Sequence, residues 1–178
     1  MDKIRTIILS LLFILNLPGD LLAWQGVVTK VVSGDTLEVM KDQRKVKIQL
    51  YGAHAPQSDQ PFSSEAKQFL SDLVVDKTVE IEAVDGSKPK QAMAIVTLEG
   101  KSINRKLLEV GLAWVDIVNC KRPECRQWQI FEAEAKSKKQ GLWVDPNPTP
   151  PWEWKEKKTG GQSEGQKRQE ERKGGSRK

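Results

Sequence analysis

The polar side chains most able to do chemistry in this 178-residue chain lie in one stretch, residues 31–57. They are Asp35, Gln49, His54 and Gln57. A carboxylate can bind a cation, and an imidazole can take up or release a proton near neutral pH. An amide can only exchange hydrogen bonds. His54 is the single histidine of the chain. Since it meets only one of the roles that a catalytic site needs, a polar loop residue is its simpler interpretation.

The hydrophobic pattern predicts that a β-hairpin carries these side chains. In residues 36–40 and again in residues 46–51, apolar residues alternate with polar ones, so each run turns one face toward a core. Ser33-Gly34-Asp35 precedes the first run, and glycine there allows backbone angles that other residues resist. We therefore expect the four side chains to rim the polar face of the hairpin.

The rest of the pattern predicts three more strands and three helices. The expected strands span residues 24–32, 77–84 and 92–98, with a turn at residues 85–90. The expected helices span residues 63–74, capped by Ser63 or Ser64, residues 102–110, ended by Gly111, and residues 123–140, ended by Gly141. This order of elements predicts an α+β fold: a five-stranded OB-type β-barrel with three α-helices.

Both ends of the chain differ from the middle. Residues 1–23 have the form of a signal peptide, with two basic residues, a short apolar run and a cleavage site after Ala23. The run is too short for an ordinary spanning helix, and an uncleaved anchor is the alternative. Residues 155–178 predict a disordered basic tail. The domain between them, residues 24–154, is close to neutral, so the basic excess of the chain sits in the tail.

Two features near the C-terminal end of the domain suggest how its surface is fastened. Four residues lie between Cys120 and Cys125, and in an exported protein this spacing favours a disulfide, with two free thiols as the alternative. Residues 145–151 are too rich in proline for a helix or a central strand. Trp152 and Trp154 would clamp that segment onto the barrel, or would remain exposed aromatics at a fraying end.

Three groups of residues carry a resemblance to a known family. They are Gly34-Asp35-Thr36, the run from Leu50 to Pro56, and Gly141-Leu142-Trp143 with the proline-rich segment that follows. Over residues 24–154 this set resembles the staphylococcal nuclease (thermonuclease) family in its exported bacterial form. The resemblance implies calcium-assisted hydrolysis of phosphodiester bonds in DNA and RNA.

The resemblance also implies which positions would do that chemistry, and most of them are changed. The family binds its metal with two aspartates and a backbone carbonyl, which fall on Asp35, His54 and Ala55. The glutamate that activates water falls on Gln57, and the two arginines that hold the phosphate fall on Gln49 and Gln91. Of these side-chain roles, only that of Asp35 keeps the residue type of the family.

The changes weaken the implied mechanism. Calcium prefers hard oxygen ligands, so imidazole is a poor replacement. Glutamine cannot accept a proton, and general-base catalysis is typically worth about 10²–10⁴ in rate. Glutamine also lacks the charged, two-pronged grip of arginine on phosphate. Lys47, Lys88 and Lys90 are phosphate-binding candidates that would compensate, although solvated surface lysines are the simpler interpretation.

Two functions from different classes follow. The first is an exported, monomeric domain, periplasmic or extracellular, that is catalytically degenerate and binds single-stranded nucleic acid or an envelope protein. Its basic tail would bind polyanions, and it would need no cofactor and no transmembrane segment after cleavage. The alternative is an active metal-dependent endonuclease with a rearranged site built from Asp35, His54 and the lysines, with Ca²⁺ as cofactor if the family site still works.

Overall fold

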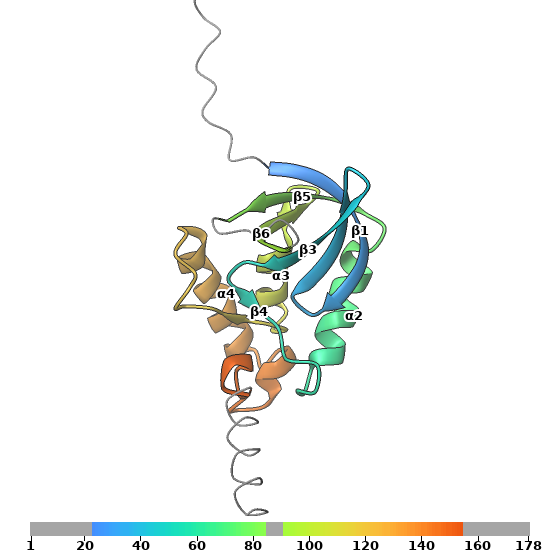
Figure 1. Cartoon of the computed structure of the whole chain (residues 1–178). Helices are drawn as coiled ribbons and strands as arrows, with labels where there is room; N and C mark the ends of the chain where they lie inside the picture. Colours follow the sequence, from blue (N-terminus) through green and yellow to red (C-terminus); the bar gives the residue numbers. More distant parts are fainter. Residues whose placement is uncertain (1–22, 85–90, 155–178) are drawn as a thin grey trace, which may run out of the picture.

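The computed structural model describes residues 23–84 and 91–154. Three predicted features lie outside the described residues: the signal segment up to residue 22, the turn at residues 85–90 with Lys88 and Lys90, and the tail at residues 155–178. The described chain begins with β1 at the top of Figure 1 and ends in the red segment at the bottom. The two ends of the domain therefore lie far apart.

The strands form one sheet in the order β3-β2-β1-β5-β6-β7. Parallel pairing of β3 with β6 joins its two sides and closes a five-stranded barrel, to which the short β7 is appended. These strands are β1 (Ala23–Ser33), β2 (Thr36–Lys41), β3 (Arg44–Leu50), β5 (Thr78–Ala83), β6 (Gln91–Leu98) and β7 (Lys101–Ser102). The predicted five-stranded OB-type barrel is confirmed, with strand limits close to those expected from the pattern.

The alternation along the strands builds the barrel core. On β3, Ile48 and Leu50 are buried, whereas Lys47 is exposed and Gln49, between the two buried residues, is half-buried. On β2, Leu37 and Val39 point inward in the same way. Because side chains alternate across a strand, this register also turns the other set of residues outward. Lys47 and Gln49 are thereby turned to the outer face, whereas Asp35, in the turn before β2, is buried rather than on an exposed rim.

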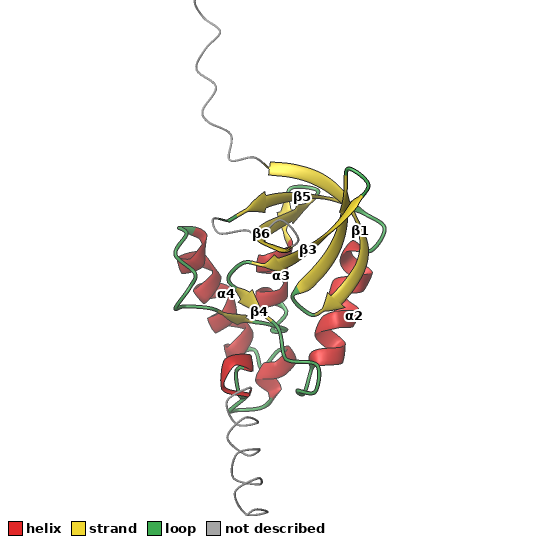
Figure 2. Ribbon diagram, viewed as in Figure 1, coloured by secondary structure: helices red, strands yellow, loops and turns green. Residues whose placement is uncertain are grey.

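Three α-helices complete the α+β fold. They are α2 (Ser63–Val74), α3 (Ile103–Glu109) and α4 (Glu124–Ser137). Figure 2 shows the helices toward the bottom of the view and the strands toward the top. α2 packs on β1, and α3 packs against both β6 and α4. Within the described residues no helix is long and apolar enough to cross a membrane.

The helix ends differ from the expected ones at two places. Neither Ser63 nor Ser64 caps α2; the helix begins after Phe62, which has a positive φ of 65° and makes no side-chain cap. The third helix ends at Ser137, and Lys139, not Gly141, takes the left-handed position after it. Gly111 does follow α3 with φ of 69°, as expected. A local cap preference is weak, so tertiary packing can override it.

Short elements of the described chain, among them two strands and a 3-10 helix, were missed by the pattern. β4 (Ala53–His54) and β8 (Trp114–Val115) pair with each other as a separate two-stranded sheet, and η1 (Gly141–Val144) is a short 3-10 helix. The side chain of Asn104 on α3 is fully buried and binds the chain just before β4. Its amide donates to the carbonyls of Tyr51 (2.9 Å) and Ala94 (3.1 Å) and accepts from the N–H of Val96 (2.9 Å). These bonds set where the β4 strand leaves the barrel.

Candidate functional site

Asp35 lies in the two-residue turn between β1 and β2. The preceding Gly34 is needed for space rather than for an unusual backbone angle, which corrects the sequence-based explanation. A Cβ atom on Gly34 would lie 2.7 Å from the Cβ atoms of Ala55 and Ala66, whereas its φ is not positive. Gly34 therefore lets the turn pack directly under the segment that follows β4.

The carboxylate of Asp35 is buried and its oxygens are held by three donors. The hydroxyl groups of Ser33 (2.7 Å) and Thr36 (3.0 Å) donate to Oδ1, and the backbone N–H of Ala55 donates to Oδ2 at 3.3 Å. Such bonds stabilise the ionised carboxylate and fix its orientation. The one acid retained from the family is thus built into the turn by its own neighbours.

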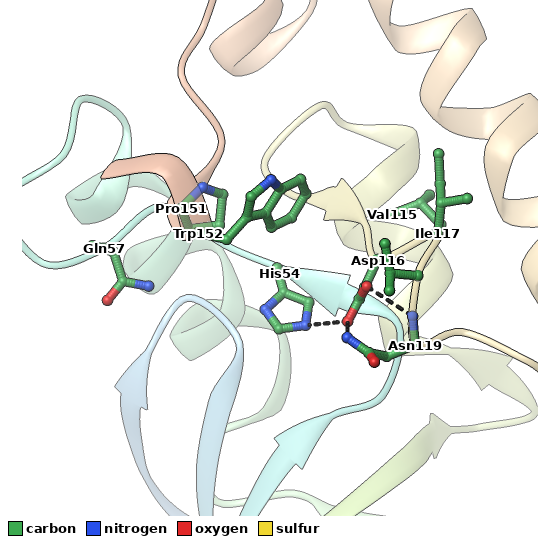
Figure 3. A pocket seen from close by; sticks show the side chains of 9 residues that line it. His54, Gln57, Val115, Asp116, Ile117, Asn119, Pro151 and Trp152 are labelled. Atoms are coloured by element: carbon green, nitrogen blue, oxygen red, sulfur yellow. Dashed lines mark hydrogen bonds and ion pairs between the residues drawn. The ribbon is translucent and has the colours of Figure 1, made fainter. Parts of the chain in front are cut away.

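His54, which the resemblance places at the family's second metal aspartate, lies at the end of β4. Its Nε2 lies 3.2 Å from Oδ2 of Asp116, a residue that directly follows β8 (Figure 3). Asp116 is in turn fixed by Asn119, whose backbone N–H donates to Oδ1 (3.0 Å) and whose amide donates to Oδ2 (2.9 Å). The imidazole therefore belongs to an ordered chain of three side chains.

The environment of Asp116 favours its charged form. Burial by itself would raise the pKa of this carboxyl, but the two hydrogen bonds from Asn119 and the interaction with His54 outweigh it. The net effect is a pKa below the ordinary value of 3.8. Asp116 is thus an anion at neutral pH, placed to orient the imidazole.

His54 and Asp116 face a pocket of about 560 Å³ (Figure 3). It lies between the β4–β8 pair and residues 145–154, which we call the C-terminal segment of the domain. Gln57 also lines it, so the structure brings together two of the expected site residues, His54 and Gln57. The remaining lining residues come from the chain after β8 and from the C-terminal segment: Val115, Asp116, Ile117, Val118, Asn119, Pro151 and Trp152. No lysine or arginine is among these lining residues.

A disulfide between Cys120 and Cys125 fastens the loop that follows Asn119, as predicted. The hydroxyl of Tyr51 lies beneath the same loop, donating to the carbonyl of Asn119 (3.2 Å) and accepting from the N–H of Lys121 (2.7 Å). The disulfide, the tyrosine and the Asp116 hydrogen bonds together give this loop a defined shape.

The other wall of the pocket is the C-terminal segment, and its two tryptophans do act as a clamp. Trp154 donates from Nε1 to Oδ2 of Asp59 at 3.2 Å, and the amide of Gln60 donates to the carbonyl of Thr149. The ring of Trp152 meets that of His54 edge to face, with 6.2 Å between centroids. The partners are the loop after β4 and His54, rather than the barrel wall.

The remaining predicted residues lie on or beside the hairpin. Gln49 is paired with Thr36 across β2 and β3, next to Asp35. Lys47 is exposed and pairs in register with Gln91, the first residue of β6. Ala55 follows His54 and is buried. Thus only part of the expected set reaches the pocket.

Asp116 and Asn119 were missed by the sequence analysis. One signal was present, because Asp116 interrupts the apolar run of residues 112–118. A carboxylate in such a run must be paired if it is buried, since an unpaired buried charge is costly. The sequence did not show which residue would pair with it, because His54 is far away in the chain.

The donor set at the family's metal position does not suit calcium. Calcium takes six to eight oxygen ligands, whereas here Asp35 is bound by three protein donors and position 54 offers a nitrogen that is already directed to Asp116. In residues 23–84 and 91–154 no group of three or more His, Cys, Asp or Glu is arranged to hold a metal ion.

The barrel, the helices and the Gly-Asp-Thr turn define a class of proteins, and comparison with known sequences agrees with it. Residues 47–145 match the family described as "Staphylococcal nuclease homologue". The chain therefore belongs to the staphylococcal nuclease family, and its domain is a nuclease-family domain.

Three relatives illustrate the similarity. An "Uncharacterized endonuclease" of Escherichia coli O157:H7 is 30% identical over 86% of this chain and 99% of its own length. A "Micrococcal nuclease" of Shigella flexneri is 26% identical over 85% of this chain and 91% of its own. "Staphylococcal-like nuclease CAN1" of Arabidopsis thaliana is 32% identical over 74% of this chain and 39% of its own. The chain thus spans only about two fifths of the plant relatives' length.

Proposed function

We propose that this chain is a nuclease-family domain that has lost calcium-dependent phosphodiester hydrolysis and serves, after export, as a binding domain. The observation that carries the proposal is the contact of His54 Nε2 with Oδ2 of Asp116, at the position that the resemblance assigns to the family's second metal aspartate. Because Nε2 of His54 is directed to the Asp116 carboxylate, it is not available to a metal, and an imidazole nitrogen is in any case a poor replacement for an oxygen ligand of calcium.

The other replacements support the same conclusion. Gln57 and Gln49 are neutral amides, which can neither take a proton from water nor offer charge to a phosphate. Losing one stabilising donor at a charged transition state costs roughly 10²–10³ in rate, although such losses do not simply add. Function has to be argued from the site and not from the fold.

The lining of the pocket favours an uncharged group as its occupant. It has no lysine or arginine, and its one carboxylate, Asp116, is already paired with His54. Phosphates of a nucleic acid would have to lie outside it, near Lys47. We therefore favour an envelope protein segment over single-stranded nucleic acid as the partner in the pocket, with the domain acting as a monomer in the periplasm or outside the cell.

A thermal-shift experiment tests the loss of the metal site. A ligand that binds only the folded state raises Tm. We therefore expect the native chain to have the same Tm in calcium as in magnesium. The variant that combines Gln49→Arg, His54→Asp and Gln57→Glu should gain a rise in Tm with calcium. A calcium-specific rise in the unmodified chain would contradict the proposal, and a single-stranded oligonucleotide that raises its Tm would favour the nucleic-acid partner.

The His54–Asp116 pair also favours the second candidate, an endonuclease with a rearranged site. With Nε2 held by Asp116, Nδ1 of His54 would accept a proton from water or from a hydroxyl group, and Asp116 would stabilise the resulting imidazolium. Cleavage assays with calcium, manganese, zinc or a chelator test it. A rate that falls in both His54→Gln and Asp116→Asn would support this candidate, whereas no cleavage under any condition would exclude it.

A further inference from the structure

Three exposed apolar side chains meet at the mouth of the pocket. Ile117 is 62% exposed, Val118 is 74% exposed and Trp152 is 43% exposed. Of the large apolar side chains that are exposed in residues 23–84 and 91–154, only these three line the same pocket; the others are Val27, Val32, Ile130 and Val144. Clustered exposed apolar residues are typical of a surface that meets a partner or a membrane.

Hydrogen bonds and a disulfide fix the loop that exposes Ile117 and Val118. The N–H of Asp116 donates to the carbonyl of Gly52 at 3.1 Å, and the N–H of Cys120 donates to the carbonyl of Asp116 at 2.8 Å. The Cys120–Cys125 disulfide follows at once. Ile117 and Val118 therefore stand at the tip of a loop that is closed at its base, so burying them would cost little further ordering.

The excess positive charge of the chain lies in the residues that follow the described domain. Residues 155–178, which start directly after Trp154, contain nine Lys or Arg and four Asp or Glu. Their excess of five positive charges equals the formal net charge of +5 of the whole chain. In the sequence this basic segment begins three residues after Trp152. The described chain ends at the bottom of Figure 1, whereas β1 and the N-terminal end of the domain lie at the top.

We propose that this end of the molecule docks onto an anionic lipid surface. Ile117, Val118 and Trp152 enter the interfacial layer, and the excess positive charge of residues 155–178 attracts the chain to the acidic headgroups. Tryptophan is favoured at the interface between lipid and water. Stable peripheral binding takes two signals, of which an apolar insertion and a polybasic stretch are a common pair. Neither signal here is large enough to act alone.

The apolar tip distinguishes this partner from a soluble polyanion. A nucleic acid or an acidic polysaccharide would bind the basic segment but would gain nothing from Ile117 and Val118, which carry no donor or charge. The inference goes beyond the proposed function, because it holds whether or not the domain retains hydrolysis. It also places the opening of the pocket at the lipid surface, where an envelope protein would meet it.

Vesicle flotation tests the inference. Residues 23–178 contain every described element of the fold, so this chain is mixed with vesicles of equal parts phosphatidylglycerol and phosphatidylcholine. Removing residues 155–178 should weaken binding at least a hundredfold, because each basic residue near an acidic surface contributes roughly fivefold, so three of the nine suffice for that loss. The variant Ile117→Asn with Val118→Asn should weaken it roughly tenfold or more. The matched control Ile130→Asn, at a residue that is 58% exposed on α4, should bind like the unmodified chain.

Two further arms make the outcome decisive. Circular dichroism and thermal unfolding establish that all variants fold, which their exposed positions predict. Binding to single-stranded DNA should depend on the basic segment and ignore the Ile117 and Val118 changes. Vesicle binding that also ignores those two changes, or that is absent, overturns the proposal in favour of a polyanion or a protein partner.

Discussion

The imidazole of His54 and the carboxylate of Asp116 face each other across the β4–β8 pair, with Nε2 and Oδ2 3.2 Å apart. An ionised carboxylate can only accept, so Nε2 must carry the hydrogen and Nδ1 is left as the nitrogen that can exchange a proton with the pocket. This relationship makes His54 an oriented polar side chain of the pocket.

Replacing Asp116 by Asn should lower the free energy of unfolding by about 1–3 kcal/mol at neutral pH, the usual range for hydrogen bonds to a charged group. Folding lowers the pKa of Asp116, so its contribution is present above the ordinary value of 3.8 and is lost as the pH falls through the lower folded value. Urea unfolding of the native and variant chains should therefore begin to converge as the pH falls below 3.8 and should coincide only below the lower folded pKa.

The matched control for that experiment is Asp76→Asn, an exposed position with a positive φ that Asn tolerates as well as Asp. It should change stability by less than about 0.5 kcal/mol at any pH. A variant of Asp116 that behaves like this control would contradict the structural role of the ion pair.

Gly52 should not tolerate a side chain. Its φ is 67°, and an added Cβ would press on Sγ of Cys120 and lie 2.8 Å from the ring of Trp128. Gly52→Ala should therefore cost about 2–4 kcal/mol, from backbone strain and overpacking together. Gly100 has φ of 75° but nothing within 4 Å, so Gly100→Ala should show the backbone strain alone, about 1 kcal/mol. Equal costs for the two variants would show that the disulfide and Trp128 do not pack against Gly52.

Removing the disulfide should disturb the pocket as well as the stability. The double change Cys120→Ser with Cys125→Ser opens a short loop, for which the loss of stability is about 2 kcal/mol. Because Asn119 precedes Cys120 and holds Asp116, the ring signals of His54 should also shift in NMR spectra. His54 is the single histidine, so its signals are unambiguous. Unchanged ring signals in a folded variant would mean that the loop positions Asp116 without help from the disulfide.

The clamp made by the C-terminal segment can be tested with Trp154→Phe, which removes the hydrogen bond from Nε1 to Asp59. Amide hydrogen exchange should become faster in residues 149–154, since a local contact that closes the segment is lost. Trp24→Phe at the far end of the barrel is the control and should leave this region unchanged. The same exchange rates in both variants would show that the segment is held without the Trp154 hydrogen bond, by its other contacts.

Much of the fold could be predicted because its pattern is local. Alternation in residues 36–40 and 46–51 needed only the period of a strand to place Ile48 and Leu50 inside. The loop disulfide followed from the spacing of two cysteines. The cap of α2 did not follow, because the start of that helix is set by Phe62 and its surroundings rather than by the hydroxyl groups of Ser63 and Ser64.

Only part of the site could be predicted from the sequence, because the rest depends on contacts between distant segments. His54 and Gln57 are near each other in the chain, and their replacement of family residues could be read directly. Asp116, Asn119 and Trp152 reach the pocket only through the β4–β8 pairing and the C-terminal clamp, both of which join distant segments. Two-residue strands carry too little pattern to be predicted from sequence.

The most direct test of the central claim is cleavage of single-stranded DNA and RNA by the chain in calcium, measured beside Asp35→Ala. Asp35 is the one acid kept from the family's metal site, so any calcium-dependent hydrolysis should require it. We expect no calcium-dependent cleavage by the native chain and no difference from Asp35→Ala. Cleavage that needs calcium and disappears in Asp35→Ala would contradict the account.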